Sequence, residues 1–248
     1  MSKTRIYQNS ELKVNEKVKL SDDAFGHIVR VLRLTEGDCV SLFNGSDAFQ
    51  YTARIDEIKK KQAWVNITNQ EEIDNESPLN LHLGQGISRG DRMDFTLQKS
   101  VELGVNKITP LFTERCGVKL SGERLAKKVE QWQKIVISAC EQSGRCIVPE
   151  VTFPMFLQDW LKEETSSLKL NLHPKATHSI MTLPMDVSQD QQKIKLLIGP
   201  EGGLSSEEIA QARQAEFQDV LLGPRVLRTE TAALTAITAL QCRFGDLK

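Results

Sequence analysis

The sequence predicts an α/β protein in which a small β-rich domain precedes a larger domain built on a mostly parallel sheet. Three observations lead to this fold class. Residues 1–72 carry short strands separated by tight turns, and residues 73–248 alternate strands with helices. Near the C-terminus, two apolar strands each end in a Gly-Pro loop that leads into a helix. Alternation of strands and helices predicts a parallel sheet covered by helices on both faces.

The composition is that of an ordinary globular protein, with 40% hydrophobic and 26% charged residues and a net charge of −1. The chain has no apolar run long enough to span a bilayer, and its first residues lack the apolar core of a signal peptide. We therefore expect a cytoplasmic protein. The balanced charge argues against a general nucleic-acid coat but leaves room for a local basic face.

The cysteines argue against both a disulfide framework and a zinc site. Their number, 5, is odd, and no two of them have the Cys-x-x-Cys spacing. The four histidines also lack the spacing of metal ligands. We therefore expect reduced thiols and no metal.

In the first domain, Ser21 is expected to cap a short helix that carries Phe25 and Ile28 on one side. Strands are expected over residues 39–43, 51–58 and 62–68, and Asn44-Gly45 is a strong hairpin signal. Short strands with such turns suggest a small barrel. The polar, acidic segment 70–78 is the best candidate for a linker.

In the second domain, hydrophobic periodicity separates strands from helices. Strands are expected over residues 79–83, 107–112, 147–151, 168–173, 193–198 and 220–222. Helices are expected over residues 93–103, 121–140, 153–161, 205–215 and 231–243. Ser205 and Glu208 form a capping box at the start of one of these helices.

The two Gly-Pro loops are the strongest functional signal in the chain. The first is Gly199-Pro200-Glu201-Gly202-Gly203, and the second begins at Gly223-Pro224. A glycine at a strand end lets backbone approach a ligand closely, because no Cβ stands in the way. Ligands of open α/β sheets usually bind at the carboxyl edge. We therefore expect the loops to form two walls of one pocket.

Neither loop matches a standard nucleotide motif. The chain lacks both G-x-G-x-x-G after a strand and G-x-x-x-x-G-K-[ST]. This argues against a dinucleotide dehydrogenase, a Rossmann-type methyltransferase and a P-loop NTPase. A single Gly-Pro pair would be explained by a plain turn, whereas two matched loops favour a binding site.

Taken together, the motifs resemble those of the RsmE family, S-adenosylmethionine-dependent methyltransferases of the SPOUT superfamily. The resemblance covers the chain end to end. It rests on residues 5–7, 27–33, 98–105, 113–115, 141–145, 148–149, 198–203 and 222–232. Cys116, where serine is expected, is a small departure.

The resemblance implies N3-methylation of one uridine in 16S ribosomal RNA of the small ribosomal subunit. It also implies a PUA-like barrel over residues 1–72 and a trefoil-knotted SPOUT domain over residues 73–248. Knots are rare exceptions to ordinary topology, and no periodicity in the sequence predicts one. SPOUT enzymes hold S-adenosylmethionine at a homodimer interface, so the resemblance implies a homodimer.

The resemblance also implies the cofactor residues. Glycines leave backbone groups accessible to an adenine, and leucines pack on its faces, although the leucines are equally compatible with an ordinary core. The implied set is Leu172, His173, Gly199, Pro200, Gly203, Leu222, Gly223, Leu227, Thr231 and Ala232.

Three residues are candidates for the chemistry of methyl transfer to uridine. N3 of uridine carries a proton. For methyl transfer this proton must be removed, or the resulting uridine anion must be stabilised. Arg228 is suited to stabilise negative charge on the flanking carbonyl oxygens, Glu230 to orient Arg228 or the base, and Glu201 to act as a base. Stabilisation of a helix N-terminus explains Glu230 and Thr231 equally well.

Six residues are candidates for RNA contacts, namely Arg5, Arg30, Arg33, Lys99, Gln142 and Arg145. Arg30 and Arg33 are suited to phosphate contacts, which position RNA without determining sequence preference. Gln142 and Arg145 follow a long predicted helix, where dimer contacts, helix capping and a surface ion pair are alternatives. Lys99 has the same ambiguity.

Two other functions remain open at this stage. A SPOUT ribose 2′-O-methyltransferase acting on ribosomal or transfer RNA has a glycine-rich stretch that resembles residues 199–205. Such enzymes carry Ser-Leu-Asn in the second loop, whereas this chain has residues 227–231, Leu-Arg-Thr-Glu-Thr. A non-catalytic RNA-binding protein that uses only the barrel is the third possibility, and the intact pair of loops argues against it.

Overall fold

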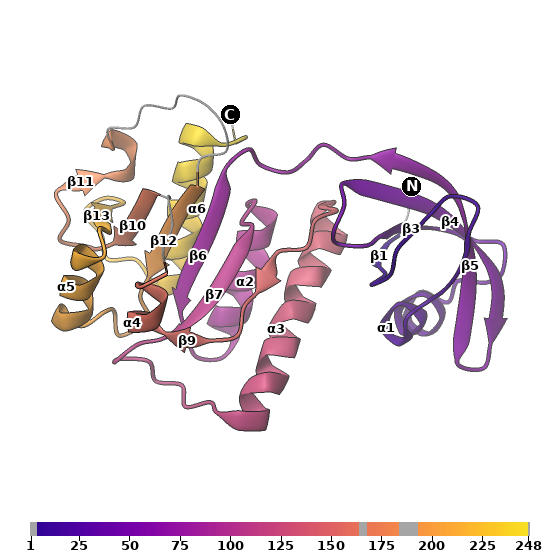
Figure 1. The fold of residues 1–248 in the computed structure, drawn as a ribbon, viewed down its shortest axis with the longest axis horizontal. Helices are drawn as coiled ribbons and strands as arrows, with labels where there is room; N and C mark the ends of the chain where they lie inside the picture. Colours follow the sequence, from indigo (N-terminus) through magenta and orange to yellow (C-terminus); the bar gives the residue numbers. More distant parts are fainter. Residues whose placement is uncertain (1–3, 164–167, 184–192, 248) are drawn as a thin grey trace. The chain divides into compact units, whose positions relative to one another are not determined.

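The computed structural model describes residues 4–163, 168–183 and 193–247 (Figure 1). Contacts divide the chain into two compact units. The first unit comprises Met1–Glu76 together with Cys140–Val148, and the second comprises Ser77–Ala139 together with Pro149–Lys248. The sequence alone assigned Cys140–Val148 to the second domain, residues 73–248, and the long helix α3 (Gly122–Ser143) ends inside this segment.

The first unit is β-rich, as predicted, and is built on a sheet of five strands in the order β1-β3-β4-β5-β2. Parallel pairing occurs between β1 and β3, and the remaining neighbours in this sheet pair antiparallel. The strands are β1 (Arg5–Tyr7), β2 (Lys17–Lys19), β3 (Cys39–Phe43), β4 (Phe49–Lys59) and β5 (Gln62–Glu72). Alternate residues of β3, β4 and β5 enter one hydrophobic core, which includes Val40, Leu42, Ile55 and Val65.

The helix predicted after Ser21 consists of a short α-helix followed by a π-helical turn. The Ser21 side chain accepts a hydrogen bond from the backbone of Ala24 and caps α1 (Asp22–Phe25). The π-helical turn η1 (Gly26–Val31) follows, and Arg33 has a φ of 56°. Both π-turns and left-handed non-glycine residues are uncommon and occur often at functional sites.

The segment Cys140–Val148 belongs to the interior of the first unit. Arg145 is 4% exposed and forms an ion pair with Glu76. One guanidinium nitrogen of Arg5 donates to the carbonyl oxygen of Arg145 at 3.0 Å. The backbone of Tyr7 donates to Glu141 Oε1 at 3.0 Å. These contacts attach the segment to β1.

The second unit is built on the parallel sheet that the sequence predicts. Its path runs β11-β13-β10-β12-β6-β7-β8, with β9 also paired to β7, and all pairings among the described strands are parallel. The strands are β6 (Asn80–Gly86), β7 (Lys107–Phe112), β8 (Glu150–Val151), β9 (Met155–Phe156), β10 (Leu168–Leu172), β11 (His178–Ser179), β12 (Lys193–Ile198) and β13 (Gln218–Leu221). The trefoil knot stays a prediction.

The helices of this unit lie against the sheet, with α2 beside α6 and α4 beside α5 (Figure 1). They are α2 (Asp91–Glu102), α3, α4 (Leu157–Trp160), α5 (Ser206–Gln214) and α6 (Thr229–Phe244), with a short 3₁₀ turn η2 (Ile180–Thr182). The helix predicted over residues 153–161 is wrong in its first half, where β9 precedes α4. Pro154 biases Phe153 toward extended backbone, and pairing of Met155 and Phe156 with β7 keeps the next two residues extended.

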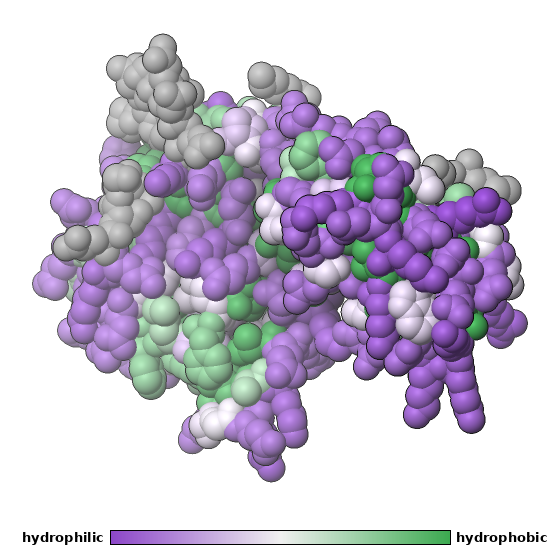
Figure 2. Space-filling model, turned by 45° about the vertical axis from the view of Figure 1, so that its right-hand side comes forward, coloured by the Kyte–Doolittle hydropathy of each residue, from purple (hydrophilic) through white to green (hydrophobic). Residues whose placement is uncertain are grey.

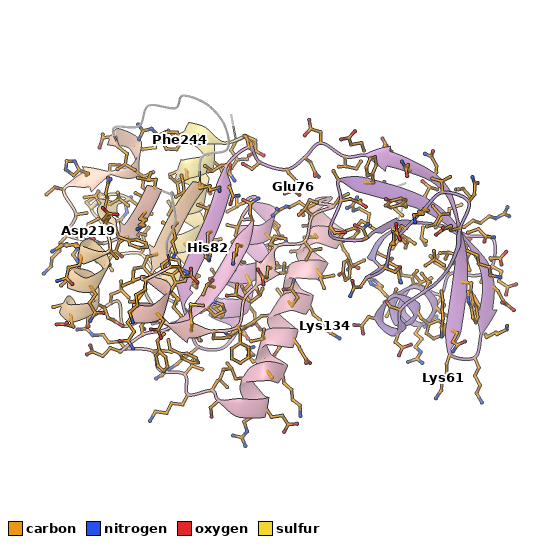
Figure 3. The ribbon with its side chains drawn as sticks, viewed as in Figure 1. Lys61, Glu76, His82, Lys134, Asp219 and Phe244 are labelled. Atoms are coloured by element: carbon orange, nitrogen blue, oxygen red, sulfur yellow. The ribbon has the colours of Figure 1, made fainter. Side chains whose placement is uncertain are left out.

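Trp160 is the centre of the packing against β6. A Cβ added at Gly84 would lie 2.4 Å from the Trp160 ring, so only glycine leaves room for the indole. The ring of His82, which is labelled in Figure 3, meets Trp160 edge-on, with ring centroids 5.5 Å apart. Figure 3 shows that His82 comes from β6. Burial, with the nearby Lys195 and Lys107 charges, lowers the pKa of His82 to about 3, so this half-buried histidine is neutral at physiological pH.

The five cysteines are all free thiols. None of the described helices is long and apolar enough to cross a membrane.

Candidate functional site

The three neighbouring strands β13, β10 and β12 end at the same edge of the second unit's sheet, and a cavity of about 600 Å³ lies there. After β12, the loop Gly199–Ser205 leads into α5, and after β13 the loop Leu222–Arg228 leads into α6. His173 and Pro174 follow β10 and add a third wall. The two Gly-Pro loops are therefore two walls of one pocket, at the carboxyl edge where parallel sheets bind ligands.

Most residues assigned to the cofactor from the sequence line this cavity. They are Leu172, His173, Gly199, Pro200, Gly203, Leu222, Gly223, Leu227 and Ala232. Thr231 is outside the lining and is exposed on the first turn of α6.

The three catalytic candidates are placed differently from one another. Glu201 and Arg228 line the cavity, and Glu230 does not. Arg228 is the exposed N-cap residue of α6, and no ion pair of its guanidinium is found among the described residues. Glu230 Oε2 is buried without a hydrogen-bond partner in the described part of the chain.

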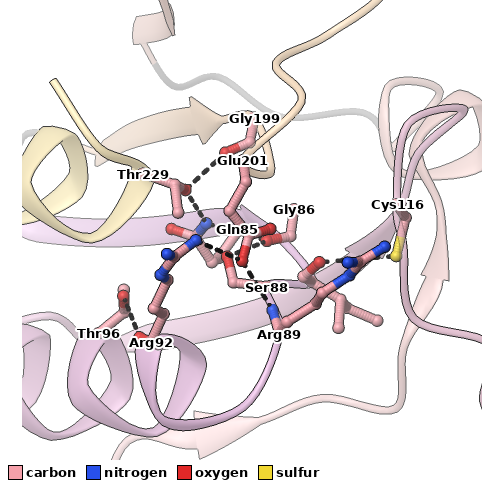
Figure 4. A network of polar contacts seen from close by, with 11 residues as sticks. Gln85, Gly86, Ser88, Arg89, Arg92, Thr96, Cys116, Gly199, Glu201 and Thr229 are labelled. Carbon is pink, nitrogen blue, oxygen red and sulfur yellow. Dashed lines mark hydrogen bonds and ion pairs between the residues drawn. The ribbon is translucent and has the colours of Figure 1, made fainter. Parts of the chain in front are cut away.

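A threonine hydroxyl joins the two loops to each other and to β6 (Figure 4). Thr229 Oγ1 donates to the carbonyl oxygen of Gly199 at 2.6 Å. Thr229 Oγ1 itself accepts a hydrogen bond from Gln85 Nε2 at 3.0 Å, and Gln85 is completely buried. Because Thr229 begins α6 and Gly199 begins the other loop, this bridge fixes the separation of the two walls.

The Glu201 carboxylate ties the first loop to the start of α2. Its Oε1 accepts from the backbone of Arg89 at 2.9 Å and from Arg92 Nη1 at 3.2 Å. Partial burial raises the pKa of Glu201, but the hydrogen bonds from backbone amides and from Arg92 outweigh it, and the net pKa is below its usual value. Glu201 is therefore ionised at neutral pH and is a weak base.

Arg115 holds the same loop from the other side. Its Nη1 donates to the carbonyl oxygen of Gly202 at 3.1 Å. A Cβ added at Gly202 would lie 3.0 Å from the Cβ of Arg115, so glycine allows this close approach.

The glycines of the two loops serve different purposes. Gly223 has a φ of 128°, and a Cβ there would meet no atom within 4 Å, so its backbone is open to a ligand. A Cβ at Gly199 would instead lie 3.1 Å from the Leu204 backbone nitrogen. Close packing within its own loop therefore accounts for Gly199, which the sequence argument had attributed to the ligand.

Sequence reasoning missed several residues of the site. Arg92, Arg115, Arg225, Val226 and Thr229 line the cavity. Arg92 and Arg115 each follow closely on a strand that ends at this edge, and this spacing was a usable signal. The buried role of Gln85 had no such signal, because a glutamine within a strand does not indicate which neighbour it faces.

The RNA-contact candidates also differ in exposure. Arg30, Arg33 and Gln142 are exposed, while Arg5 is half-buried. Lys99 forms an ion pair with Glu102 at 2.7 Å. A phosphate contact by Arg145 would require its buried ion pair with Glu76 to open.

Two family models match the chain. The RNA methyltransferase domain matches residues 75–241, and the RNA methyltransferase PUA domain matches residues 12–68. The predicted PUA-like domain is thereby confirmed.

Relatives and solved structures agree with these matches. The chain is 41% identical to ribosomal RNA small subunit methyltransferase E of Buchnera aphidicola from Schizaphis graminum, over 98% of this chain and 97% of the relative. A methyltransferase of Legionella pneumophila, solved with its bound cofactor SAM, has a TM-score of 0.94 and 46% identity, with all of both chains covered. Ribosomal RNA small subunit methyltransferase E of Neisseria gonorrhoeae, bound to S-adenosyl methionine, has a TM-score of 0.90 and 42% identity, covering 99% of this chain and 100% of that one. The chain belongs to the RsmE family of RNA methyltransferases, as its motifs predicted.

Proposed function

We propose that the protein methylates N3 of a specific uridine in 16S ribosomal RNA, with S-adenosylmethionine as the methyl donor. The observation that carries this proposal is the cavity between the two Gly-Pro loops, with Arg228 on its wall and no ion pair of that guanidinium within the described part of the chain. The solved relatives from Legionella and Neisseria hold this cofactor, and the curated relatives are named for the small-subunit substrate.

The residues of the cavity suit S-adenosylmethionine. A volume of about 600 Å³ is in the range of small-molecule sites. Leu172, Leu222 and Leu227 offer apolar surface to an adenine, and the backbone around Gly223 is free of side chains. We assign Gly199, Pro200, Gly203, His173 and Ala232 to the same site, and Thr231 to its margin.

Methylation of N3 requires that the uridine anion be stabilised. The cofactor supplies an electrophilic methyl group, and the products are the N3-methylated base, S-adenosylhomocysteine and a proton. Arg228 stabilises negative charge on the uracil carbonyl oxygens, which lowers the pKa of N3 and the barrier to methylation. Glu230, in the first turn of α6, supports the orientation of Arg228.

Glu201 is better suited to positioning than to proton transfer. Its lowered pKa and its hydrogen bonds from Arg89 and Arg92 support a role in fixing the first loop beside the cofactor. The proton of N3 then leaves to solvent, with Arg228 supplying the electrostatic assistance.

RNA contacts and assembly complete the proposal. Arg30 is in η1 and Arg33 follows it; both are exposed and suited to contact phosphate oxygens.

Val226, on the wall of the cavity, is 85% exposed, and a second copy of the chain would cover it in a homodimer. Sedimentation equilibrium tests the dimer. The ribosomal substrate implies a cytoplasmic location.

Nucleoside analysis tests the reaction. The protein is incubated with labelled S-adenosylmethionine and small subunits from cells that lack this modification. Label in 3-methyluridine is the expected result. Label in a ribose-methylated nucleoside would favour the 2′-O-methyltransferase, and absence of both label and cofactor binding would favour the non-catalytic RNA-binding protein.

Gly223→Val should weaken S-adenosylmethionine binding by at least about tenfold, because the branched side chain strains a φ of 128° and enters the open space beside the cavity. Isothermal titration calorimetry measures the affinity. Gly122→Val is the matched control, since Gly122 also has a positive φ and open space but lies at the start of α3. Equal affinities for the two variants would remove Gly223 from the site.

Arg228→Ala should lower kcat about a hundredfold or more and leave the cofactor Kd within about threefold, because the anion loses its positive partner. The rise of kcat with pH should also move to higher pH, since N3 becomes less acidic. Arg228→Lys keeps the charge and should recover part of kcat. An unchanged pH profile in Arg228→Ala would contradict the assigned role.

The double variant Arg30→Ala/Arg33→Ala should bind small subunits more weakly. The slope of log K against log salt should become shallower by the amount that corresponds to the loss of about two phosphate contacts. Filter binding at several salt concentrations measures both quantities. Cofactor affinity should stay at the wild-type value. RNA binding with an unaltered salt dependence would assign the phosphate contacts to other residues.

A further inference from the structure

Three phenylalanines form an exposed aromatic surface in the second unit. Phe112 ends β7, Phe156 is in β9, and Phe153 lies between β8 and β9. Phe153 is 58% exposed, Phe156 is 61% exposed, and Phe112 is half-buried. Figure 2 shows a hydrophobic area low on this unit, at the height that β9 and α4 have in Figure 1.

The rings are held in a fixed arrangement although they face solvent. Phe112 and Phe156 are register partners in the pairing of β7 with β9, and their ring centroids are 5.6 Å apart at 44°. The strand pairing fixes the backbone beneath both rings. Large exposed apolar surface of this kind usually marks an interaction site.

The aromatic surface is on the same sheet edge as the cofactor cavity. β12, β6 and β7 are neighbours, so two strand spacings, about 10 Å, separate the end of β12 from the end of β7. In register, Ile198 is opposite Gln85, and Gln85 is opposite Pro110, so Gly199 and Phe112 lie at nearly the same level. Nucleotides next to one held in the cavity can therefore reach the rings.

The connection between cavity and rings is basic. Arg115 follows Phe112 by three residues, and its guanidinium is hydrogen-bonded to Gly202 on the cavity wall. The Arg89 guanidinium packs against Gly117 of the same segment, where it leaves no room for a Cβ. Lys119 is exposed, and Glu114 is the single carboxylate between Phe112 and Lys119. This charge complements a phosphate backbone.

We propose that Phe112, Phe153 and Phe156 form a stacking platform for unpaired bases of the substrate RNA that flank the methylated nucleotide. The inference rests on the proposed function and adds a second RNA-binding region, in the catalytic unit. Aromatic side chains stack on bases of any sequence, and each stacked base contributes about fivefold to a hundredfold in affinity. The exposed side chains of Arg89 and Lys119 would hold the phosphates between the platform and the cavity.

Leucine and tyrosine substitutions separate stacking from general hydrophobicity. Phe153→Leu/Phe156→Leu keeps apolar surface and removes the rings, whereas Phe153→Tyr/Phe156→Tyr keeps the rings. In the full chain, the leucine variant should raise KM for unmethylated small subunits, and Kd for a fluorescent oligouridylate of about ten nucleotides, by at least about fivefold. The tyrosine variant should stay within about twofold of wild type. Kd for S-adenosylmethionine and the melting temperature should not change.

Phe95→Leu is the matched control, because Phe95 is a 46% exposed phenylalanine on α2, and its RNA affinity should equal that of wild type. If Phe153→Leu/Phe156→Leu bound RNA with wild-type affinity, the proposal of a stacking platform would be wrong. A loss of self-association in sedimentation without a change in RNA affinity would also contradict it and would make the surface an interface between copies. If wild-type protein itself fails to methylate the subunits, the proposed function fails, and this outcome is distinct from equal activity of wild type and variant.

Discussion

The buried hydroxyl of Thr229 holds the site together. It donates a hydrogen bond to the carbonyl oxygen of Gly199, the first residue of one Gly-Pro loop, and Thr229 directly follows the other loop. Gln85, on β6, donates a hydrogen bond to the same hydroxyl. Gln85 and Thr229 are buried, so a missing partner for either would cost about 1–3 kcal/mol. The separation of the loops, and therefore the width of the cavity, depends on this bridge.

Charged groups around the bridge divide into two kinds. The guanidinium groups of Arg92 and Arg115 are committed to the first loop, through Glu201 and through backbone carbonyl oxygens, whereas Arg89 binds Glu201 only through its backbone N–H. Arg228 is left facing the cavity without an ion pair among the described residues. A guanidinium without a partner at a ligand site is available to an anion, which agrees with stabilisation of a deprotonated uridine. The loop is thus fixed by one group of arginines, and the proposed chemistry falls to another.

Sequence reasoning predicted the parts of this arrangement that are local in the chain. The strand end at Ile198, the capping box at Ser205 and the β-rich first unit all follow from patterns over a few residues, and the second strand, expected to end at Leu222, ends one residue earlier at Leu221. Contacts between distant segments were not predictable in this way. Gln85 and Thr229 are 144 residues apart, and Arg145 pairs with Glu76 across 69 residues. No periodicity encodes such partners, and for this reason Arg145 was assigned to the surface. Pro154 was a local signal that helical periodicity outweighed.

The most direct test of this account is calorimetric titration of S-adenosylmethionine into Thr229→Val and Thr229→Ser. Valine has nearly the shape of threonine but leaves the Gly199 carbonyl and the Gln85 amide without their partner. Loops no longer held in place must then be ordered on binding, at a cost in affinity. The account predicts cofactor affinity at least about fivefold weaker in Thr229→Val and near wild type in Thr229→Ser. Wild-type affinity in a folded Thr229→Val variant would contradict the central role of the bridge.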